Sequence, residues 1–137
     1  MEKIVTVGIV DDDKTTRQLL TFLLGKAGCQ IEFSVGDGHN AVTRYNKQPV
    51  NILLLDIDMP TMNGIEALKE IKKSDNHVYA VMVSSTNHAE VVKEALAAGA
   101  SDYILKPFSI GRIHKMIETY RSKMAKAADL AVATPSP

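Results

Sequence analysis

The sequence predicts an α/β fold in which helices cover both faces of a parallel sheet. Five short runs of β-branched or aliphatic residues alternate with five longer amphipathic stretches. Parallel neighbours need long crossover connections, and the amphipathic stretches supply them. The runs Ile52–Leu55 and Val81–Val83 are apolar at every position. This is the pattern of central strands that are covered on both faces.

The composition is that of one ordinary globular domain. The chain has 137 residues, of which 45% are hydrophobic and 23% are charged. Sixteen basic residues balance sixteen acidic ones, which argues against direct nucleic-acid binding and against a general grip on anionic membranes. Cys29 is the only cysteine, so an internal disulfide and a cysteine-based zinc site are excluded. No apolar stretch approaches the ~20 residues that cross a bilayer, and we expect a cytoplasmic protein without membrane insertion.

The predicted elements follow one another in strict alternation. The five strands, each bounded by polar or turn residues, are Ile4–Val10, Gln30–Val35, Asn51–Leu55, Val78–Val83 and Tyr103–Leu105. The five helices are Lys14–Ala27, His39–Lys47, Ile65–Lys73, His88–Ala98 and Ile110–Lys126. Gly28 and Gly99 follow the first and fourth helices and suit a left-handed C-terminal cap. Residues 1–126 would then form the domain, and residues 127–137, which are rich in Ala and end in Thr-Pro-Ser-Pro, a flexible tail or linker stub.

Capping residues mark the starts of three helices. Asn63 precedes Glu66 by three residues, and Asn87 precedes Glu90 by three, so both pairs resemble capping boxes. Ser109 is placed to cap the last helix. These signals predict N-terminal caps at Asn63, Asn87 and Ser109 for the third, fourth and fifth helices.

Polar side chains directly follow four of the five predicted strands. They are Asp11, Asp12 and Asp13 after the first strand, Asp56 and Asp58 after the third, Ser84, Ser85 and Thr86 after the fourth, and Lys106 after the fifth. In an open parallel sheet, ligands bind at the carboxyl ends of the strands. Since unpaired charges are expensive to bury, we expect this set to form one site at that edge.

The residue types at this edge indicate phosphoryl chemistry with a metal ion. Neighbouring carboxylates repel one another unless a cation lies among them. Oxygen-only ligation favours Mg²⁺, for which Mn²⁺ can substitute, over zinc, and Mg²⁺ commonly shares phosphate oxygens. A carboxylate can act as a nucleophile toward phosphorus and form an acyl phosphate. Lys106 would neutralise charge on the phosphoryl oxygens, and the Ser84 hydroxyl would donate a hydrogen bond to one of them.

Four segments resemble the receiver domain of two-component response regulators, and in particular the chemotaxis regulators. They are Ile9–Asp13, Leu53–Gly64, Val81–Ser85 and Gly99–Phe108, within a match that runs from about Ile4 to Lys126. The resemblance implies a flavodoxin-like, doubly wound sheet of five parallel strands in the order 2-1-3-4-5, with five helices. It also implies a protein that takes part in its own phosphorylation and autodephosphorylation and is not an enzyme with an external substrate.

The resemblance assigns roles at the acidic site. Asp56 would be the phosphoacceptor. Asp11 and Asp12 would be the acidic pair that binds Mg²⁺, together with Asp56 and the backbone carbonyl of Asp58. Lys106 would contact the phosphoryl group. Asp13 would then cap the helix that begins after it, although Asp12 and Asp13 as the metal-binding pair is an alternative.

The resemblance also implies a conformational switch. Ser84, where the family more often has Thr, and Tyr103 would form the switch pair, and the output face would comprise the fourth helix, fifth strand and fifth helix. Asp58 and Thr86 are the positions expected to tune the lifetime of the phosphoryl group, in a direction that the sequence does not predict. The implied partners are a histidine kinase or histidine phosphotransfer protein as donor, and a downstream protein target or output domain. Phosphorylation-linked dimerisation is a further expectation.

Two other functions compete with the receiver interpretation. The Asp56-Ile-Asp58 sequence resembles the nucleophile motif of haloacid-dehalogenase-type phosphatases, in which Asp58 would act as general acid and base. That motif normally follows the first strand of its domain, whereas two strand–helix units precede it here. The other alternative is a degenerate receiver that acts as a binding module without phosphorylation.

Overall fold

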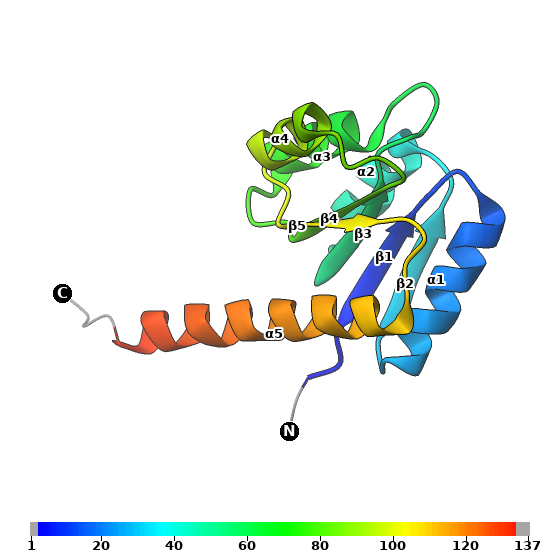
Figure 1. Ribbon diagram of the computed structural model, residues 1–137. Coiled ribbons are helices and arrows are strands. Elements are labelled where there is room, and N and C mark those ends of the chain that lie inside the picture. Colours follow the sequence, from blue (N-terminus) through cyan, green and yellow to red (C-terminus); the bar gives the residue numbers. More distant parts are fainter. Residues whose placement is uncertain (1–2, 134–137) are drawn as a thin grey trace.

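The computed structural model describes residues 3–133 and contains a single five-stranded parallel sheet (Figure 1). The strands are β1 (Thr6–Val10), β2 (Gln30–Val35), β3 (Ile52–Asp56), β4 (Ala80–Ser84) and β5 (Asp102–Leu105). Their order is β2-β1-β3-β4-β5, and every neighbouring pair is parallel. The predicted doubly wound α/β fold is therefore confirmed, with the reversal of strand order between β1 and β3.

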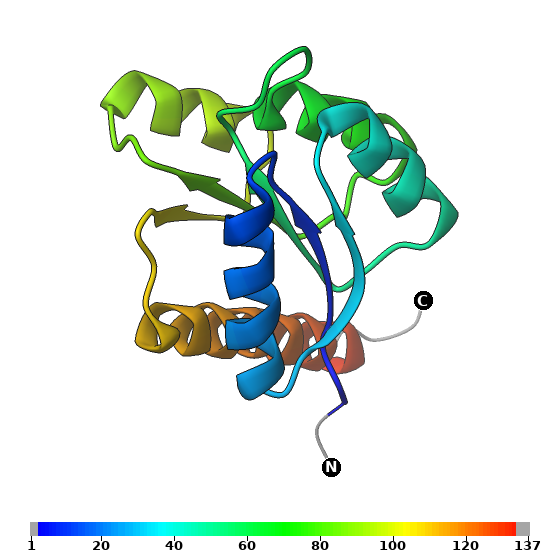
Figure 2. The same cartoon turned by 90° about the vertical axis from the view of Figure 1, so that its right-hand side faces the viewer.

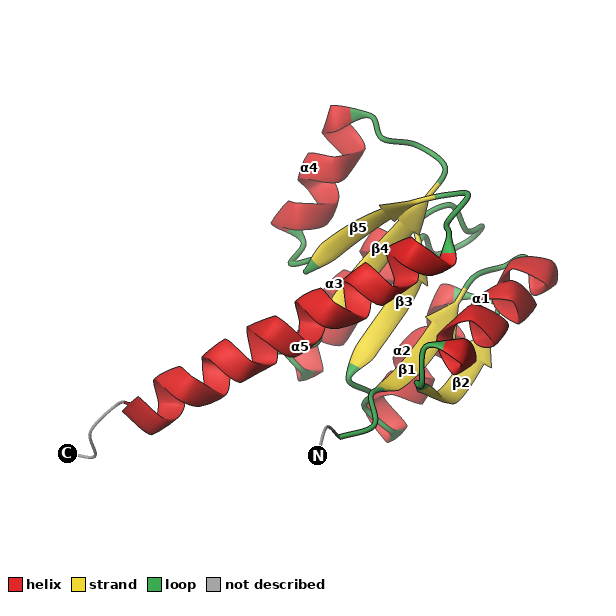
Figure 3. Ribbon diagram, turned by 60° about the horizontal axis from the view of Figure 1, so that its bottom comes forward, coloured by secondary structure: helices red, strands yellow, loops and turns green. Residues whose placement is uncertain are grey.

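The helices form two layers, one on each face of the sheet. They are α1 (Lys14–Lys26), α2 (Gly38–Lys47), α3 (Gly64–Ser74), α4 (Ala89–Ala97) and α5 (Ile110–Ala133). Helices α1 and α5 cover one face, and α2, α3 and α4 cover the other (Figures 2 and 3). None of these helices, over residues 3–133, combines the length and hydropathy that a membrane span requires.

The core consists of two apolar clusters separated by the sheet. Successive residues of β3 alternate between them: Leu53 and Leu55 pack under α2, α3 and α4, whereas Ile52 and Leu54 pack under α1 and α5. All four side chains are buried. Burial on both faces explains why this strand reads as a continuous apolar run.

The ends of the central strands lie level at the carboxyl edge of the sheet. Val10 lies beside Leu55, and Asp56 lies beside Val83. Strands β3 and β4 each end one residue later than predicted, so Asp56 and Ser84 are the last residues of their strands. Their side chains are therefore held by the sheet and not by a loop.

The predicted N-terminal caps are confirmed at two of three positions. The Asn63 side chain and Glu66 form a reciprocal capping box at α3, and the Ser109 hydroxyl accepts a hydrogen bond from the third residue of α5. The capping box at Asn87 was wrong, because α4 begins one residue later and its N-cap, His88, has no side-chain cap. The Thr86 hydroxyl instead accepts the His88 N–H at 3.2 Å, which closes a turn before the helix.

The helix C-termini agree with the sequence except at α5. Gly28 and Gly99 have φ angles of 87° and 101°, the left-handed conformation expected of a glycine cap. Helix α5 continues to Ala133, seven residues past its predicted end, and extends beyond the sheet (Figure 3). The predicted tail is thus helical from 127 to 133, since four alanines and one leucine among these seven residues favour continuation of the helix. The rest of that prediction, residues 134–137, lies outside the described residues.

Candidate functional site

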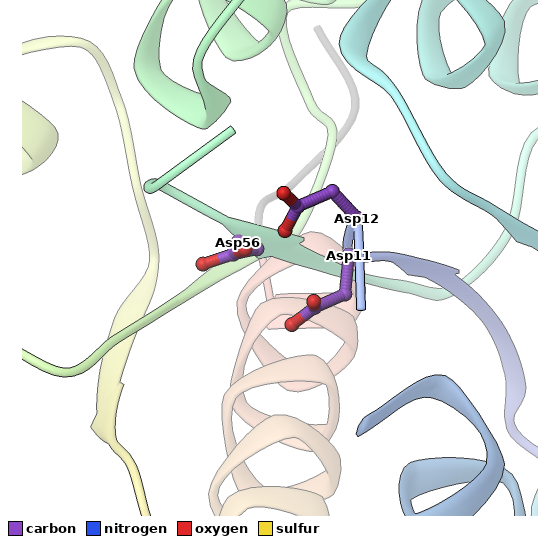
Figure 4. A group of neighbouring side chains, drawn as sticks. All are labelled: Asp11, Asp12 and Asp56. Carbon is purple, nitrogen blue, oxygen red and sulfur yellow. The ribbon is translucent and has the colours of Figure 1, made fainter. Parts of the chain in front are cut away.

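Three carboxylates converge at the carboxyl edge of the sheet. Asp11 and Asp12 follow β1, Asp56 ends β3, and one oxygen from each lies within 4.8 Å of the others (Figure 4). Asp11 and Asp56 are each 1% exposed, and Asp12 is exposed. Asp13 lies apart from this group because its carboxylate caps α1, where it accepts hydrogen bonds from the Thr16 backbone N–H and hydroxyl. The geometry therefore favours Asp11 and Asp12 as the acidic pair.

Lys106 brings a positive charge to the two buried carboxylates. Its Nζ lies 2.9 Å from Asp11 Oδ2 and 3.4 Å from Asp56 Oδ1. Its backbone N–H donates to the carbonyl of Ser84 at 2.8 Å, which fixes the start of the side chain next to β4. Burial acts to lower the pKa of Lys106, but the two carboxylates outweigh it and raise that pKa, so the ammonium stays charged.

The negative charge of Asp56 is unfavourable when no metal ion is bound. Burial, followed by the negative charge of Asp11, raises the pKa of Asp56 from 3.8 to about 6, and Lys106 opposes this rise. The backbone N–H of Asp58 donates to Asp56 Oδ1 at 3.2 Å, which also favours the ionised form. A second positive charge at the site would bring that pKa back down.

The residues fit a hard cation such as Mg²⁺. Asp11 Oδ1 accepts the Asp13 N–H at 2.8 Å, whereas Asp11 Oδ2 is buried and accepts no hydrogen bond from residues 3–133. Lys106 approaches this oxygen as an ion pair without the direction of a hydrogen bond. An exposed neighbour, Asp12, leaves the group open to solvent on one side. Oxygen donors with a free buried lone pair and an open side are what Mg²⁺ with partial hydration requires.

Ser84 is linked to Asp58 across the edge of the sheet. The Ser84 side chain is fully buried, and its hydroxyl donates to Asp58 Oδ2 at 3.0 Å. Its oxygen accepts the Thr86 N–H at 3.2 Å. The sequence pattern correctly predicts that Ser84 and Asp58 lie beside Asp56, but it contains no signal for the bond between them. The predicted metal ligation by the Asp58 carbonyl stays a prediction.

Tyr103, the second member of the predicted switch pair, is half-buried and packs against the apolar cluster under α4. Its hydroxyl donates to the backbone carbonyl of Thr86 at 2.7 Å. Arg112 on α5 holds the backbone of β5, because its Nη2 lies 3.2 Å from both Asp102 Oδ1 and the Tyr103 carbonyl oxygen. The structure therefore joins Tyr103 to both the Ser84 loop and α5.

Sequence reasoning missed two arginines that orient the site. Arg17 Nη1 donates to the backbone carbonyl of Asp11 at 2.7 Å and so braces the end of β1 from helix α1. Arg112 braces β5 in the same way from α5. Their position in the first turn of a helix that follows a site strand was the available signal, because that turn lies at the carboxyl edge of the sheet.

The fold and site define a class of small α/β proteins with an acidic, oxygen-rich site at the carboxyl edge of a five-stranded parallel sheet. The family model described as "Response regulator receiver domain" matches residues 7–118. The chain belongs to this family, and the receiver resemblance stated from the motifs is confirmed.

Relatives of the chemotaxis type are similar over most of the chain. The chemotaxis protein CheY of Thermotoga maritima is 39% identical over 105 residues, which cover 77% of this chain and 88% of that protein. CheY of Bacillus subtilis is 37% identical, with 80% and 91% covered. Among solved structures, the CheX-CheY-BeF3-Mg complex from Borrelia burgdorferi has a TM-score of 0.81 at 32% identity, covering 84% of this chain and 87% of that chain. In sequence and in fold, the chain is therefore similar to receivers of the CheY type.

Proposed function

We propose that the protein is a two-component response regulator in which Asp56 accepts a phosphoryl group in a Mg²⁺-dependent reaction. The observation that carries the proposal is one buried carboxylate in contact with a cation and two acids. Asp56 lies 3.4 Å from the Lys106 ammonium and within 4.8 Å of Asp11 and Asp12. Phosphoryl transfer needs positioning and charge neutralisation, and this arrangement supplies both.

The donor would be the phosphohistidine of a histidine kinase or a histidine phosphotransfer protein. A carboxylate oxygen of Asp56 attacks phosphorus, the new P–O bond forms, and the P–N bond breaks with its electron pair going to the imidazole nitrogen. Lys106 neutralises charge on the phosphoryl oxygens. Asp11, Asp12, Asp56 and the backbone carbonyl of Asp58 would hold Mg²⁺, or Mn²⁺ in its place. The ion supplies further charge neutralisation when bound. The Borrelia burgdorferi neighbour, whose complex includes BeF3 and Mg²⁺, supports this set.

The donor would dock over the open side of the site next to α1. A pocket of about 350 Å³ borders Lys106 there. It is lined by Thr16, Leu19, Ser85, Lys106, Pro107 and Phe108. Leu19 and Phe22, three residues apart on α1, are 46% and 59% exposed and offer an apolar contact surface beside this pocket. A phosphohistidine protein that covers them brings its imidazole to the edge at which Asp56 lies.

The phosphorylated state would be read at the face formed by α4, β5 and α5. Each of these elements leaves a large apolar side chain exposed: Leu96 by 53%, Leu105 by 42% and Ile110 by 40%. Tyr103 lies on the same strand and is bonded to the Ser84 loop, so a move of Ser84 toward the phosphoryl group reaches this face. A downstream protein target, an output domain or a second phosphorylated copy would bind the switched state and shift the population toward it.

The protein would work as a cytoplasmic switch rather than as an enzyme with an external substrate. Membership of the receiver family, and the position of Asp56 after the third strand, support this over the dehalogenase-type alternative. Curated relatives include longer proteins, such as a protein-glutamate methylesterase of Paramagnetospirillum magneticum, in which the match covers 28% of the length. A receiver of this kind can therefore act alone or control an attached domain.

The test is intact mass after incubation with acetyl phosphate, with and without Mg²⁺. We expect the wild type to gain one phosphoryl group only with Mg²⁺, and Asp56→Asn to gain none. Asp129→Asn, which changes an exposed carboxylate on α5, is the matched control and should behave as the wild type. No gain from acetyl phosphate or from a phosphorylated histidine phosphotransfer protein would indicate a degenerate receiver. Repeated release of phosphate from an external phosphate ester would indicate the phosphatase.

A further inference from the structure

The Ser84 hydroxyl has one proton, and in this structure that proton already forms a hydrogen bond. Ser84 Oγ donates it to Asp58 Oδ2 at 3.0 Å, and the same oxygen accepts the Thr86 N–H at 3.2 Å. The side chain is fully buried, so water cannot replace a lost partner without a change of structure. A phosphoryl oxygen on Asp56 can receive this hydrogen bond only if Asp58 gives it up.

Asp58 is well placed to compete for that proton. It lies two residues after Asp56, and its own backbone N–H donates to Asp56 Oδ1 at 3.2 Å. Its side chain is exposed, and it takes part in none of the ion pairs found among residues 3–133. A carboxylate of this kind is a strong acceptor, because hydrogen bonds to ionised groups are about twice as strong as neutral ones.

We propose that the Asp58 carboxylate is a positioning group that holds the Ser84 hydroxyl in the unphosphorylated orientation and competes for it with the phosphoryl group on Asp56. The inference rests on the proposed function. It adds the direction in which Asp58 would act on the bound phosphoryl group. Asp58 weakens the hold of the site on a phosphoryl group by the free energy of the Ser84–Asp58 hydrogen bond.

The same contact is linked to the proposed output face by hydrogen bonds on either side of Thr86. Asp58 holds Ser84, Ser84 accepts the Thr86 N–H, and the Thr86 carbonyl accepts the Tyr103 hydroxyl at 2.7 Å. When the Ser84 hydroxyl leaves Asp58 and turns toward the phosphoryl group, the Thr86 N–H loses its acceptor, Ser84 Oγ. Asp58 therefore biases the resting position of Tyr103 as well as the occupancy of the site.

The competing explanation is plain charge repulsion between Asp58 and an anionic phosphoryl group. The two differ in their dependence on Ser84, because repulsion acts without the hydroxyl and competition does not. They also differ in the effect of Asp58→Asn, which removes the charge but keeps an acceptor oxygen.

A double-mutant cycle tests the proposal, with calorimetric titration of beryllofluoride in the presence of Mg²⁺ as the probe. Asp58→Ala should bind beryllofluoride about tenfold more tightly in the Ser84 background, the size expected for loss of one hydrogen bond to a charged group at a half-open site. In the Ser84→Ala background the same change should alter affinity less than about twofold. Ser84→Thr keeps a hydroxyl and should restore the gain, and Asp58→Asn should show only part of it.

Equal gains from Asp58→Ala with and without the Ser84→Ala substitution, or a full gain from Asp58→Asn, would overturn competition in favour of repulsion. A wild type that takes up neither beryllofluoride nor a phosphoryl group would instead overturn the proposed function. A readout without metal or anion accompanies the titration. In metal-free protein, Asp58→Ala should shift the backbone amide resonance of Thr86 clearly more than Asp58→Asn does, and an unchanged resonance would show that no such hydrogen bond holds Ser84.

Discussion

Replacing Asp56 by asparagine should make the metal-free protein more stable at neutral pH. Burial and the Asp11 carboxylate raise the pKa of Asp56 to about 6, against 3.8 for the free group. Between these two pH values the unfolded chain releases a proton that the folded protein keeps. The stability that this carboxyl contributes is therefore fully present below about pH 4 and is lost as the pH rises through about 6. Asparagine has nearly the same shape and carries no charge, so it avoids the loss.

The magnitude follows from the size of the pKa change. A rise of about two pKa units, at about 1.4 kcal/mol per unit, corresponds to about 3 kcal/mol at about pH 7.5. Asp56 is only 1% exposed, so solvent screening reduces this little. The Lys106 ammonium, 3.4 Å from Asp56 Oδ1, loses one of its two partners in the variant. We expect a net gain of about 2 kcal/mol at about pH 7.5 and almost none at about pH 4.

Urea unfolding followed by circular dichroism, with EDTA present, measures the difference across pH 4 to 8. Asp129→Asn removes an exposed carboxylate on α5 and should show no gain that depends on pH in this way. Adding Mg²⁺ should stabilise the wild type more than Asp56→Asn, because the variant lacks one of the proposed metal ligands. An equal gain at pH 4 and pH 7.5, or a loss at pH 7.5, would refute the assignment of the strain to Asp56.

Three further substitutions probe the same edge of the sheet by urea unfolding at pH 7.5. Lys106→Met removes the cation between two buried carboxylates and should cost about 2–3 kcal/mol, part of which Mg²⁺ should restore; an unchanged stability without metal would contradict the ion-pair geometry. Thr61 has a φ of 68°, which is unfavourable for a β-branched residue, so Thr61→Gly should stabilise by about 0.5–1 kcal/mol while Thr61→Ala gains little. An added Cβ at Gly64 would overlap the carbonyl oxygen of Asp56, so Gly64→Ala should cost about 2 kcal/mol or more and slow phosphorylation. Gly25→Ala is its control, since nothing lies within 4 Å of a Cβ there and a helical alanine should stabilise by about 0.5–1 kcal/mol.

The layered fold was predictable from the spacing of the hydrophobic residues and the length of the apolar runs. Runs such as Ile52–Leu55 can satisfy both faces of a sheet only when helices cover each face. Strand order is different, since periodicity does not tell which strands are neighbours, and here it came from the motif resemblance. The end of α5 was misjudged because the Ala-rich segment after Lys126 has no stop signal before residue 133. The Ala-rich composition of this segment was interpreted as a flexible tail, although the helix propensity of alanine favours a helix.

The candidate site was predictable to the extent that strand ends determine it. Asp11, Asp12, Asp56 and Lys106 converge because parallel strands end at one edge. The sequence pattern does not predict side-chain rotamers, and the Ser84–Asp58 hydrogen bond depends on them. The turn before α4, which replaces the predicted cap at Asn87, likewise depends on a side-chain hydrogen bond, from the His88 N–H to the Thr86 hydroxyl. Under the proposed function, these are the contacts that would change between the two states of the protein.

The electrostatic cost of burying Asp56 and the affinity of the site for a cation are thermodynamically linked. The fold keeps an anion in its core with too little positive charge around it, and the pKa of about 6 records that deficit. Any bound cation that reduces the deficit must stabilise the folded chain by the same amount that the fold contributes to binding it. Wild type saturated with Mg²⁺ should therefore approach or exceed the stability of metal-free Asp56→Asn at pH 7.5. Under the proposed function, a receiver with a neutral residue in place of Asp56 would gain stability and would lose both a ligand of the ion and the proposed nucleophile.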